Sequence, residues 1–187
     1  MTTWVALLRA VNVGGRNAVR MADLRRVVGA LPAHDVRTYV QSGNVVFASS
    51  TRTEAKVVDA LTASLIETFG FEIGVVVRSA AALDAAVAAN PLAAGRDPAR
   101  LAVTFLSAPP AAGTVGDGIQ TIDGEEFALV GREIYLHAPN GLGRSKLTPV
   151  LSERRLGVRA TTRNWRTTTT LAAMAATPAT ATAATTD

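Results

Sequence analysis

The sequence predicts an α+β fold with a ferredoxin-like βαββαβ first lobe and a second, smaller α+β lobe. Three observations lead to this class. The chain has 187 residues, 48% of them apolar and 18% charged, which is the composition of an ordinary globular protein. Short apolar runs bounded by turn residues alternate with segments of helical period. Over residues 3–78 these elements occur in the order strand, helix, strand, strand, helix, strand.

The first lobe is expected at residues 1–78. It begins with an apolar, β-branched run at residues 3–11, which is typical of a buried strand. The next segment has one apolar helical face that ends at Pro32 and comprises Met21, Leu24, Val27, Val28 and Leu31. A hairpin at residues 36–48, a helix at 57–69 and a strand at 73–78 follow. Right-handed crossovers then place both helices on one side of the sheet.

The second lobe is expected at residues 79–174. A helix at its start is followed by a strand at residues 101–107 and by two strands at 126–130 and 133–137. Ser145 then opens a single helix that Gly157 ends, and a short strand and a last helix from Asn164 complete the lobe. No internal sequence repeat is visible, although the element order allows the second half to echo the first in topology. Residues 175–187 are rich in Ala and Thr and predict a disordered tail.

Composition excludes several kinds of chemistry. The chain has no cysteine, which removes disulfides, thiolate nucleophiles and cysteine-bound metals, and fits a reducing compartment. It starts without the features of a secretory signal and has no uncharged apolar stretch of about 18 residues. We therefore expect a cytoplasmic protein that does not contact a membrane. The two histidines have no obvious partners, so we expect neither a metal site nor a cofactor.

Charge is distributed unevenly along the chain. Residues 1–48 contain six arginines and two aspartates, and residues 132–166 contain eight basic and two acidic residues. The segment between them has five basic and ten acidic residues. Two basic ends around an acidic middle can form an anion-binding face. The alternative is that the oppositely charged segments attract each other within the molecule.

Four segments together resemble the bacterial family called domain of unknown function 1697. They are Leu7–Asn17, Val36–Phe47, Gly141–Leu147 and Ala160–Trp165, and the resemblance extends from about residue 4 to about residue 172. It implies an α+β protein whose first part is ferredoxin-like. No activity is established for the family, so it supplies no catalytic residues. The chain departs from the family where Ala10 replaces a usual glycine and in the stretch from Leu31 to His34.

The loop after the first strand is one candidate anion site. A glycine-rich turn between a strand and a helix leaves backbone N–H groups at a positive helix end. Arg16 could add a charge-assisted contact. The candidate ligand-binding residues here are Asn12, Gly14, Gly15, Arg16 and Asn17. The alternative is a loop that only caps the helix, because neither the P-loop nor the dinucleotide-binding glycine spacing is present.

The glycine-rich segment of the second lobe is the other candidate anion site. Two glycines precede Ser145, a plausible N-cap, and basic side chains flank the helix start. Basic residues oppose the helix dipole there unless an anion or a carboxylate lies nearby. The candidate residues are Gly143, Arg144, Ser145 and Lys146. The alternative is an ion pair with the acidic middle segment.

Two further groups of side chains could contact a nucleic acid. Arg37, Tyr39 and Gln41 alternate along one strand and share one face, which could stack bases if it were open. Arg163 and Trp165 could bind a base or a sugar at the start of the last helix. The alternatives are a sheet face packed against the other lobe, and a tryptophan that anchors the interface between the lobes.

The leading functional hypothesis is an anion-binding protein for nucleic acid or for a phosphate-bearing ligand. One alternative is an enzyme that acts on a small phosphorylated or carboxylated substrate in a cleft between the lobes. That enzyme would have a compact pocket enclosing the amides of Asn12, Asn17, Gln41 and Asn44. No nucleophile, metal cluster or carboxylate pair supports it, so the sequence favours a non-enzymatic role. The third hypothesis is a homodimeric protein-interaction module that uses the first sheet as its interface.

Overall fold

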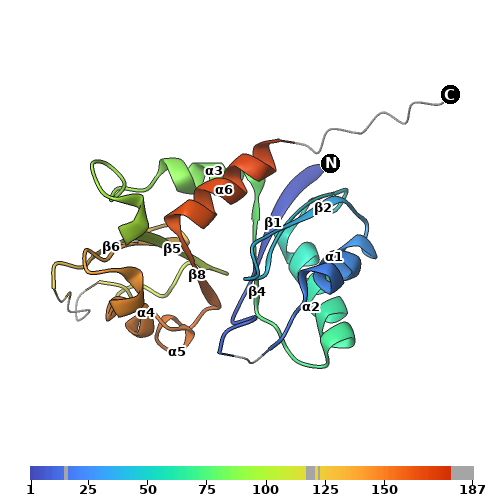
Figure 1. Ribbon diagram of the computed structural model, residues 1–187, viewed down its shortest axis with the longest axis horizontal. Helices are drawn as coiled ribbons and strands as arrows, with labels where there is room; N and C mark the ends of the chain where they lie inside the picture. Colours follow the sequence, from blue (N-terminus) through green and yellow to red (C-terminus); the bar gives the residue numbers. More distant parts are fainter. Residues whose placement is uncertain (15–16, 117–120, 122, 178–187) are drawn as a thin grey trace.

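The computed structural model describes residues 1–14, 17–116, 121 and 123–177. It contains two four-stranded antiparallel sheets, one from each half of the chain, with helices packed on both (Figure 1). The predicted α+β class is therefore confirmed. Among the described residues, no helix has the length and apolar character needed to cross a membrane.

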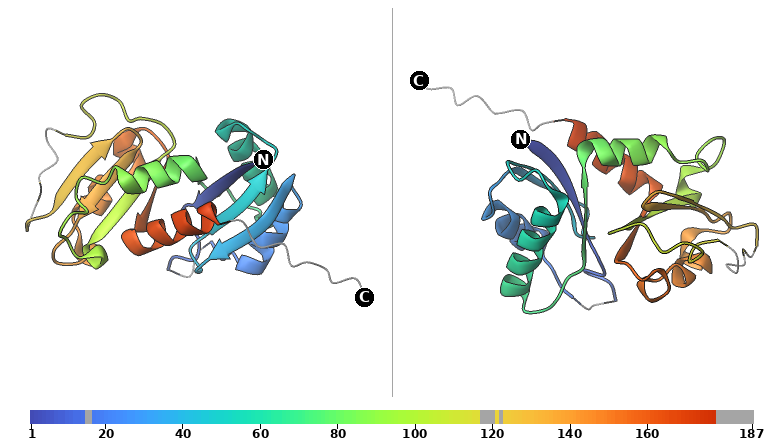
Figure 2. Two further views of the ribbon diagram at one scale, coloured as in Figure 1. Left: turned by 90° about the horizontal axis from the view of Figure 1, so that it is seen from above. Right: turned by 180° about the vertical axis from the view of Figure 1, so that it is seen from behind.

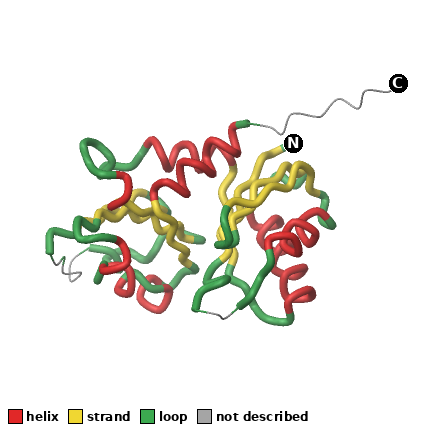
Figure 3. Tube along the Cα trace, in the orientation of Figure 1, coloured by secondary structure: helices red, strands yellow, loops and turns green. Residues whose placement is uncertain are grey.

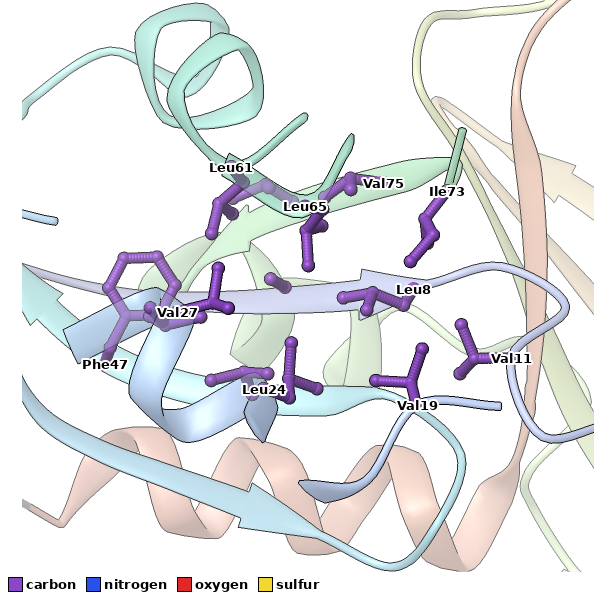
Figure 4. Packing of buried hydrophobic residues seen from close by; sticks show 14 of the residues in the cluster. Leu8, Val11, Val19, Leu24, Val27, Phe47, Leu61, Leu65, Ile73 and Val75 are labelled. Atoms are coloured by element: carbon purple, nitrogen blue, oxygen red, sulfur yellow. The ribbon is translucent and has the colours of Figure 1, made fainter. Parts of the chain in front are cut away.

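The first sheet has the strand order β2-β3-β1-β4. Its elements are β1 (Thr2–Leu8), α1 (Met21–Gly29), β2 (Ala33–Tyr39), β3 (Asn44–Ser49), α2 (Glu54–Phe69) and β4 (Val75–Ser79). This is the predicted βαββαβ order. The side chains of α1 and α2 meet one face of the sheet in an apolar core, where Leu24 and Leu65 lie opposite Leu8 (Figure 4).

The second sheet repeats this strand order as β6-β7-β5-β8. Its strands are β5 (Leu101–Leu106), β6 (Glu126–Val130), β7 (Glu133–His137) and β8 (Ala160–Asn164), with short 3-10 turns η1 (Pro98–Arg100) and η2 (Leu142–Arg144). On its outer face pack α4 (Leu147–Val150) and α5 (Glu153–Leu156). The second half thus echoes the topology of the first, although the described residues between β5 and β6 contain no helix that corresponds to α1.

Two helices join the lobes. α3 (Ala80–Ala88) follows β4 directly, and α6 (Trp165–Ala176) follows β8 directly. The two helices pack against each other between the sheets (Figures 2 and 3). A central core made of both helices and the inner faces of both sheets includes Val5, Leu7, Phe105, Tyr135 and Leu171. Each sheet is therefore covered on both faces.

The prediction of a single helix after Ser145 is wrong. The chain forms the short helices α4 and α5 instead, with Leu151 and Ser152 between them. Ser152 has an extended backbone, with φ −83° and ψ 155°, and its carbonyl accepts the first hydrogen bonds of α5 from Arg155 and Leu156. A helix cannot continue through an extended residue. Gly157 does end the segment in the left-handed conformation, as predicted.

The C-terminal end departs slightly from expectation. α6 continues to Ala176, beyond the predicted start of the tail at residue 175. Asn164 caps this helix, as its side chain accepts a hydrogen bond from the Thr167 N–H at 2.8 Å. The predicted disorder of residues 178–187 concerns a segment outside the described residues.

Candidate functional site

Two buried arginines occupy equivalent positions in the two halves of the chain. Arg78 lies opposite Val5 in the β1–β4 pair, and Arg163 lies opposite Val103 in the β5–β8 pair. Each is followed by a polar residue that caps the next helix, Ser79 for α3 and Asn164 for α6. Only 1% of Arg78 and 9% of Arg163 is exposed.

Each arginine reaches across the interface to the last residue of the equivalent strand in the opposite lobe. The Nη2 atom of Arg78 donates to the carbonyl of Leu106, the last residue of β5, at 2.7 Å. The Nη2 atom of Arg163 donates to the carbonyl of Leu8, the last residue of β1, at 2.6 Å. Such reciprocal contacts are those of an interface with approximate two-fold symmetry.

The two arginines differ in the group that faces their Nε atoms. Arg78 Nε donates to the carboxylate of Glu133, the first residue of β7, at 2.8 Å. The Glu54 carboxylate lies 3.7 Å from its Nη1 atom. Burial lowers the pKa of Arg78, and the Glu133 carboxylate opposes that effect. The charge of Arg78 is thus balanced by carboxylates.

Arg163 meets a neutral group at the corresponding place. Its Nε atom donates to the amide oxygen of Asn44, the first residue of β3, at 2.6 Å. Its other N–H groups bond to the hydroxyl of Thr161 and to the carbonyls of Leu8, Ser42 and Thr162. No described carboxylate forms an ion pair with it, and burial lowers its pKa to about 10. Arg163 is therefore a buried cation balanced only by neutral dipoles.

A groove borders the edge strand of each sheet. The β4 groove has a volume of about 970 Å³ and lies between α2 with β4 on one side and Ser107, Arg132 and residues 157–159 on the other. Its charged lining residues cancel, as Arg132 and Arg159 oppose Glu54 and Asp59. Arg132 also binds both oxygens of Glu54, at 2.7 and 2.9 Å. The β4 groove is mostly apolar, with a neutral rim.

The β8 groove occupies the equivalent place in the second sheet. It consists of two cavities of about 300 and 270 Å³ that share the lining residues Ala10, Val13, Thr162 and Arg163. Hydroxyl groups of two serines and of several threonines, Thr161 and Thr162 among them, lie in its walls. Its charged lining residues are Arg9, Glu153 and Arg163, a net charge of +1. The β8 groove is smaller, more polar and positively charged.

The first glycine-rich loop forms one wall of the β8 groove through Ala10 and Val13. The side-chain amides of its two asparagines form hydrogen bonds to nearby backbone carbonyls. The Asn12 side chain donates to the carbonyls of Val19 and Gln41, and the Asn17 side chain donates to the carbonyl of Ala10. Gly14 is exposed, with a φ of 59°. The candidates Gly15 and Arg16 lie outside the described residues.

The second glycine-rich segment contacts the acidic hairpin before β6. Lys146 places its ammonium 3.8 Å from Asp123, and its backbone N–H donates to the buried carboxylate of Glu125 at 3.1 Å. The ion-pair alternative for this segment is thus present. The Ser145 hydroxyl accepts from the Leu147 N–H, while Gly143 and Arg144 are exposed. Leu142 lines a cavity of about 470 Å³ that shares Asn164 with the β8 groove, so both loops approach the start of α6.

The open sheet face considered for base stacking is covered. Tyr39 packs against the central core, and Arg37 Nη2 donates to the carbonyl of Met174 in α6 at 2.9 Å. Trp165 also packs against that core. Gln41 lies in the exposed turn after β2. The alternatives named for these residues, packing of the sheet face and an interface tryptophan, are the arrangements found.

Sequence reasoning missed several residues of this region, among them Arg9, Arg78 and Glu133. The sequence did contain one signal that could have revealed the interface between the lobes. Arg78 is a single charged residue after the apolar residues Val75, Val76 and Val77. A charged residue in such a strand needs a partner, and here the partner comes from the other lobe. Among the described residues, no cluster of three or more side chains has the composition of a metal site.

Comparisons with known proteins agree with this architecture. A family model described as "Protein of unknown function (DUF1697)" matches residues 1–135, which confirms the resemblance drawn from the sequence motifs. A solved structure of the conserved bacterial protein SP0830 from Streptococcus pneumoniae is similar, with a TM-score of 0.77 and 24% identity. The match covers 95% of this chain and 99% of that one and supports the fold. The curated proteins contain no match to this chain.

Proposed function

Because this chain belongs to DUF1697, a family of unknown function, we propose from its geometry that it binds a small phosphate-bearing anion in the β8 groove. One observation carries the proposal. Arg163 is a buried guanidinium without a carboxylate partner among the described residues, and it lines both cavities of that groove. An unpaired buried charge costs on the order of 3 kcal/mol, so an anion next to it would gain a strong electrostatic contribution.

Arg163 would supply charge to the ligand, because all five of its N–H groups already have acceptors. Hydrogen bonds would come from hydroxyl groups. The Thr161 oxygen accepts from Arg163, and the Ser42 oxygen accepts from Asn44, so each hydroxyl proton remains available to an anion. Arg9 is half-exposed and could turn from Glu153, 3.2 Å away, toward a bound phosphate.

A small ligand fits the surroundings better than a nucleic acid. A nucleic acid needs several basic and aromatic side chains on one accessible surface. Here Arg37 and Tyr39 face α6, Lys146 lies beside Asp123, and Arg163 is buried. Two cavities near 300 Å³ match the size of a phosphate with a small substituent.

The enzyme alternative receives less support. Its expected pocket would enclose free amide groups, yet the Asn12 amide is bonded to Val19 and Gln41. The Asn44 amide is bonded to Tyr39, Ser42 and Arg163. The homodimer alternative stays a prediction that the mass of the protein in solution would test.

The test adds a carboxylate to the groove without disturbing buried residues. Val13 lines the groove and is 66% exposed, while Val40 is 51% exposed on the neighbouring hairpin turn and does not line the groove. We expect Val13→Asp to weaken the binding of inorganic phosphate about tenfold, which corresponds to about 1.4 kcal/mol. Val40→Asp adds the same charge elsewhere and should leave binding unchanged.

Binding would be measured by calorimetry with inorganic phosphate and with adenosine monophosphate at constant ionic strength. Equal effects of Val13→Asp and Val40→Asp would mean that only the net charge matters, and would overturn the site. Absence of binding by the unmodified chain at tens of millimolar would overturn the function. Fluorescence anisotropy with short RNA and DNA at two salt concentrations tests the nucleic-acid alternative, which steep salt dependence would favour.

A further inference from the structure

We infer that the edge strand β6 pairs with β6 of a second copy of this chain, so that two four-stranded sheets join into one continuous sheet. β6 is the outer edge of the β6-β7-β5-β8 sheet and lies at the opposite end of that sheet from β8. The inference therefore concerns a surface that the proposed function does not use, and each copy keeps its own β8 groove.

The backbone of β6 leaves hydrogen-bonding groups unpaired at two residues. The Leu106 N–H donates to the carbonyl of Arg132 at 2.9 Å, so the even-numbered residues of the β7 segment bond to β5. The odd-numbered residues of β7 bond to β6, where they lie opposite its even-numbered residues. The N–H and C=O groups of Phe127 and Leu129 therefore point away from β7, and no described residue bonds to them.

The equivalent edge of the first sheet is protected against pairing with another chain. β2 has a register shift between His34 and Arg37, and Asp35 between them has a φ of 52° and pairs with Arg37. Bulges and charges of this kind keep edge strands from associating. β6 has a regular register and exposes Leu129 and Val130, by 38% and 41%. Of these two equivalent edges, that of β6 is the open and apolar one.

The sequence of β6 is complementary to itself. With a two-fold axis at Ala128, Phe127 of one copy lies opposite Leu129 of the other, and their outward N–H and C=O groups bond in both directions. Phe127 packs on the face of the sheet that α4 and α5 cover, and Leu129 shares that face by strand alternation. The dimer thus gains two apolar cross-strand pairs. At the axis, Ala128 meets only the small side chain of Ala128.

The charges fit the same arrangement. Glu126 is the one charged residue of β6, and Arg96 binds both of its carboxylate oxygens at 2.9 Å. In the dimer it lies opposite Val130 rather than opposite another carboxylate. The acidic turn before β6, which contains Asp123, comes near Arg132 in the turn after β6 of the other copy. A second copy of the chain therefore suits this edge.

The absence of cysteine from the chain allows a direct test of the register. Ala128→Cys places two thiols at a non-hydrogen-bonded pair, where the Cα atoms lie about 4.5 Å apart and a disulfide can form. Val130→Cys is the matched control, because the two residues 130 lie roughly 14 Å apart along the strands. Under mild oxidation, Ala128→Cys should form mostly covalent dimer, and Val130→Cys should stay largely monomeric.

Sedimentation velocity of the full chain measures the association without a crosslink. Because a pair of five-residue strands is smaller than the roughly 1,200 Å² of a stable interface, we expect a dissociation constant of about 10–100 µM. Leu129→Pro removes an N–H that the β7 ladder does not use, so the fold should remain while dimerisation weakens at least tenfold. Leu129→Lys should act similarly. Ile66→Lys adds the same charge to a 43% exposed residue of α2 and should have no effect.

Three results would overturn the inference. They are a chain that stays monomeric at about 1 mM, dimerisation retained in Leu129→Pro, or equal crosslinking of the two cysteine variants. A monomer would leave the β6 edge to a strand of another protein. Far-UV circular dichroism shows whether each variant is folded. Calorimetry with inorganic phosphate should give the same affinity for Leu129→Pro as for the unmodified chain, so failure of the dimer and failure of the anion site are distinguishable.

Discussion

Arg78 bonds to the Glu133 carboxylate at 2.8 Å, whereas Arg163 makes the corresponding contact with the Asn44 amide at 2.6 Å. Both guanidinium groups are buried where the lobes meet. The lobes are thus held together by the same contact made twice, once between two charges and once between a charge and a dipole. This difference predicts how the chain responds to loss of either arginine.

We expect Arg78→Met to destabilise the protein more than Arg163→Met. Removing Arg78 leaves the Glu133 side chain, which is 14% exposed, without its partner, and a stranded carboxylate costs about 3–5 kcal/mol. Removing either arginine strands several neutral acceptors, so these losses largely offset each other in the comparison. Removing Arg163 strands no carboxylate and also removes an unbalanced buried charge. Urea unfolding at pH 7 would measure the difference.

A double variant checks the reason for that order. Arg78→Met combined with Glu133→Leu removes both charges and should recover part of the stability lost in Arg78→Met, because apolar residues can replace a buried pair at little cost. If the double variant were less stable than Arg78→Met alone, the stranded carboxylate would not be the cause.

Gly43→Ala should be strongly destabilising. Gly43 has a φ of +71°, and an added Cβ would lie 2.6 Å from Val11 Cγ2 and 2.7 Å from Leu8 Cβ. Gly70 has a similar φ of +76° but open space around it, so Gly70→Ala measures the backbone strain alone, about 1–2 kcal/mol. We expect Gly43→Ala to cost a further 1–3 kcal/mol, roughly, from overpacking. If chemical denaturation showed that Gly43→Ala and Gly70→Ala lose the same unfolding free energy, overpacking against Val11 and Leu8 would be contradicted.

Ala10→Gly should stabilise the protein. Ala10 has a φ of +53°, a left-handed conformation that costs a residue with a Cβ about 1–2 kcal/mol. A glycine adopts this conformation without that penalty. Ala30 has a φ of −78°, so Ala30→Gly relieves no such strain and should lower the melting temperature slightly. A lower melting temperature for Ala10→Gly would contradict the assignment of strain.

Much of the fold could be predicted because its determinants are local. The strands β6 and β7 have the predicted bounds, since their apolar residues are bounded by turn residues and joined at Gly131, which has a φ of +61°. The prediction of one helix that spans Leu151 was wrong. Its apolar spacing fits a helix, but the extended backbone at Ser152 divides it.

The candidate site could be predicted only in part, because its properties arise between segments far apart in the sequence. The sequence marked Arg163 and Asn44 separately, as a possible base contact and a possible pocket amide. Their hydrogen bond, and the burial that makes the charge of Arg163 unusual, depend on the packing of two sheets. The ion pair between Lys146 and the acidic segment was one of the two alternatives that the sequence offered, because charge distribution alone suggests it.

Tyr135→Phe should change how stability depends on pH. The Tyr135 hydroxyl is buried and donates to the carbonyl of Ala86 at 2.7 Å, and burial raises its pKa to about 12. A hydroxyl with a usual pKa near 10 in the unfolded chain then stabilises the fold fully below about pH 10. That contribution is lost as the pH rises through the folded pKa of about 12, because the unfolded chain releases the proton first. At pH 7 the unmodified protein should therefore be more stable than Tyr135→Phe by about 1 kcal/mol.

Near pH 11 that advantage should shrink or reverse, because the Tyr135→Phe variant has no phenolic proton to lose at this position. Arg163 acts in the opposite direction over the same range, since burial lowers its pKa to about 10 and its contribution to stability rises with pH. Both proteins contain Arg163, so the difference between their unfolding free energies isolates the tyrosine. A difference that stays constant from pH 7 to pH 11 would show that Tyr135 ionises equally in the folded and unfolded chains.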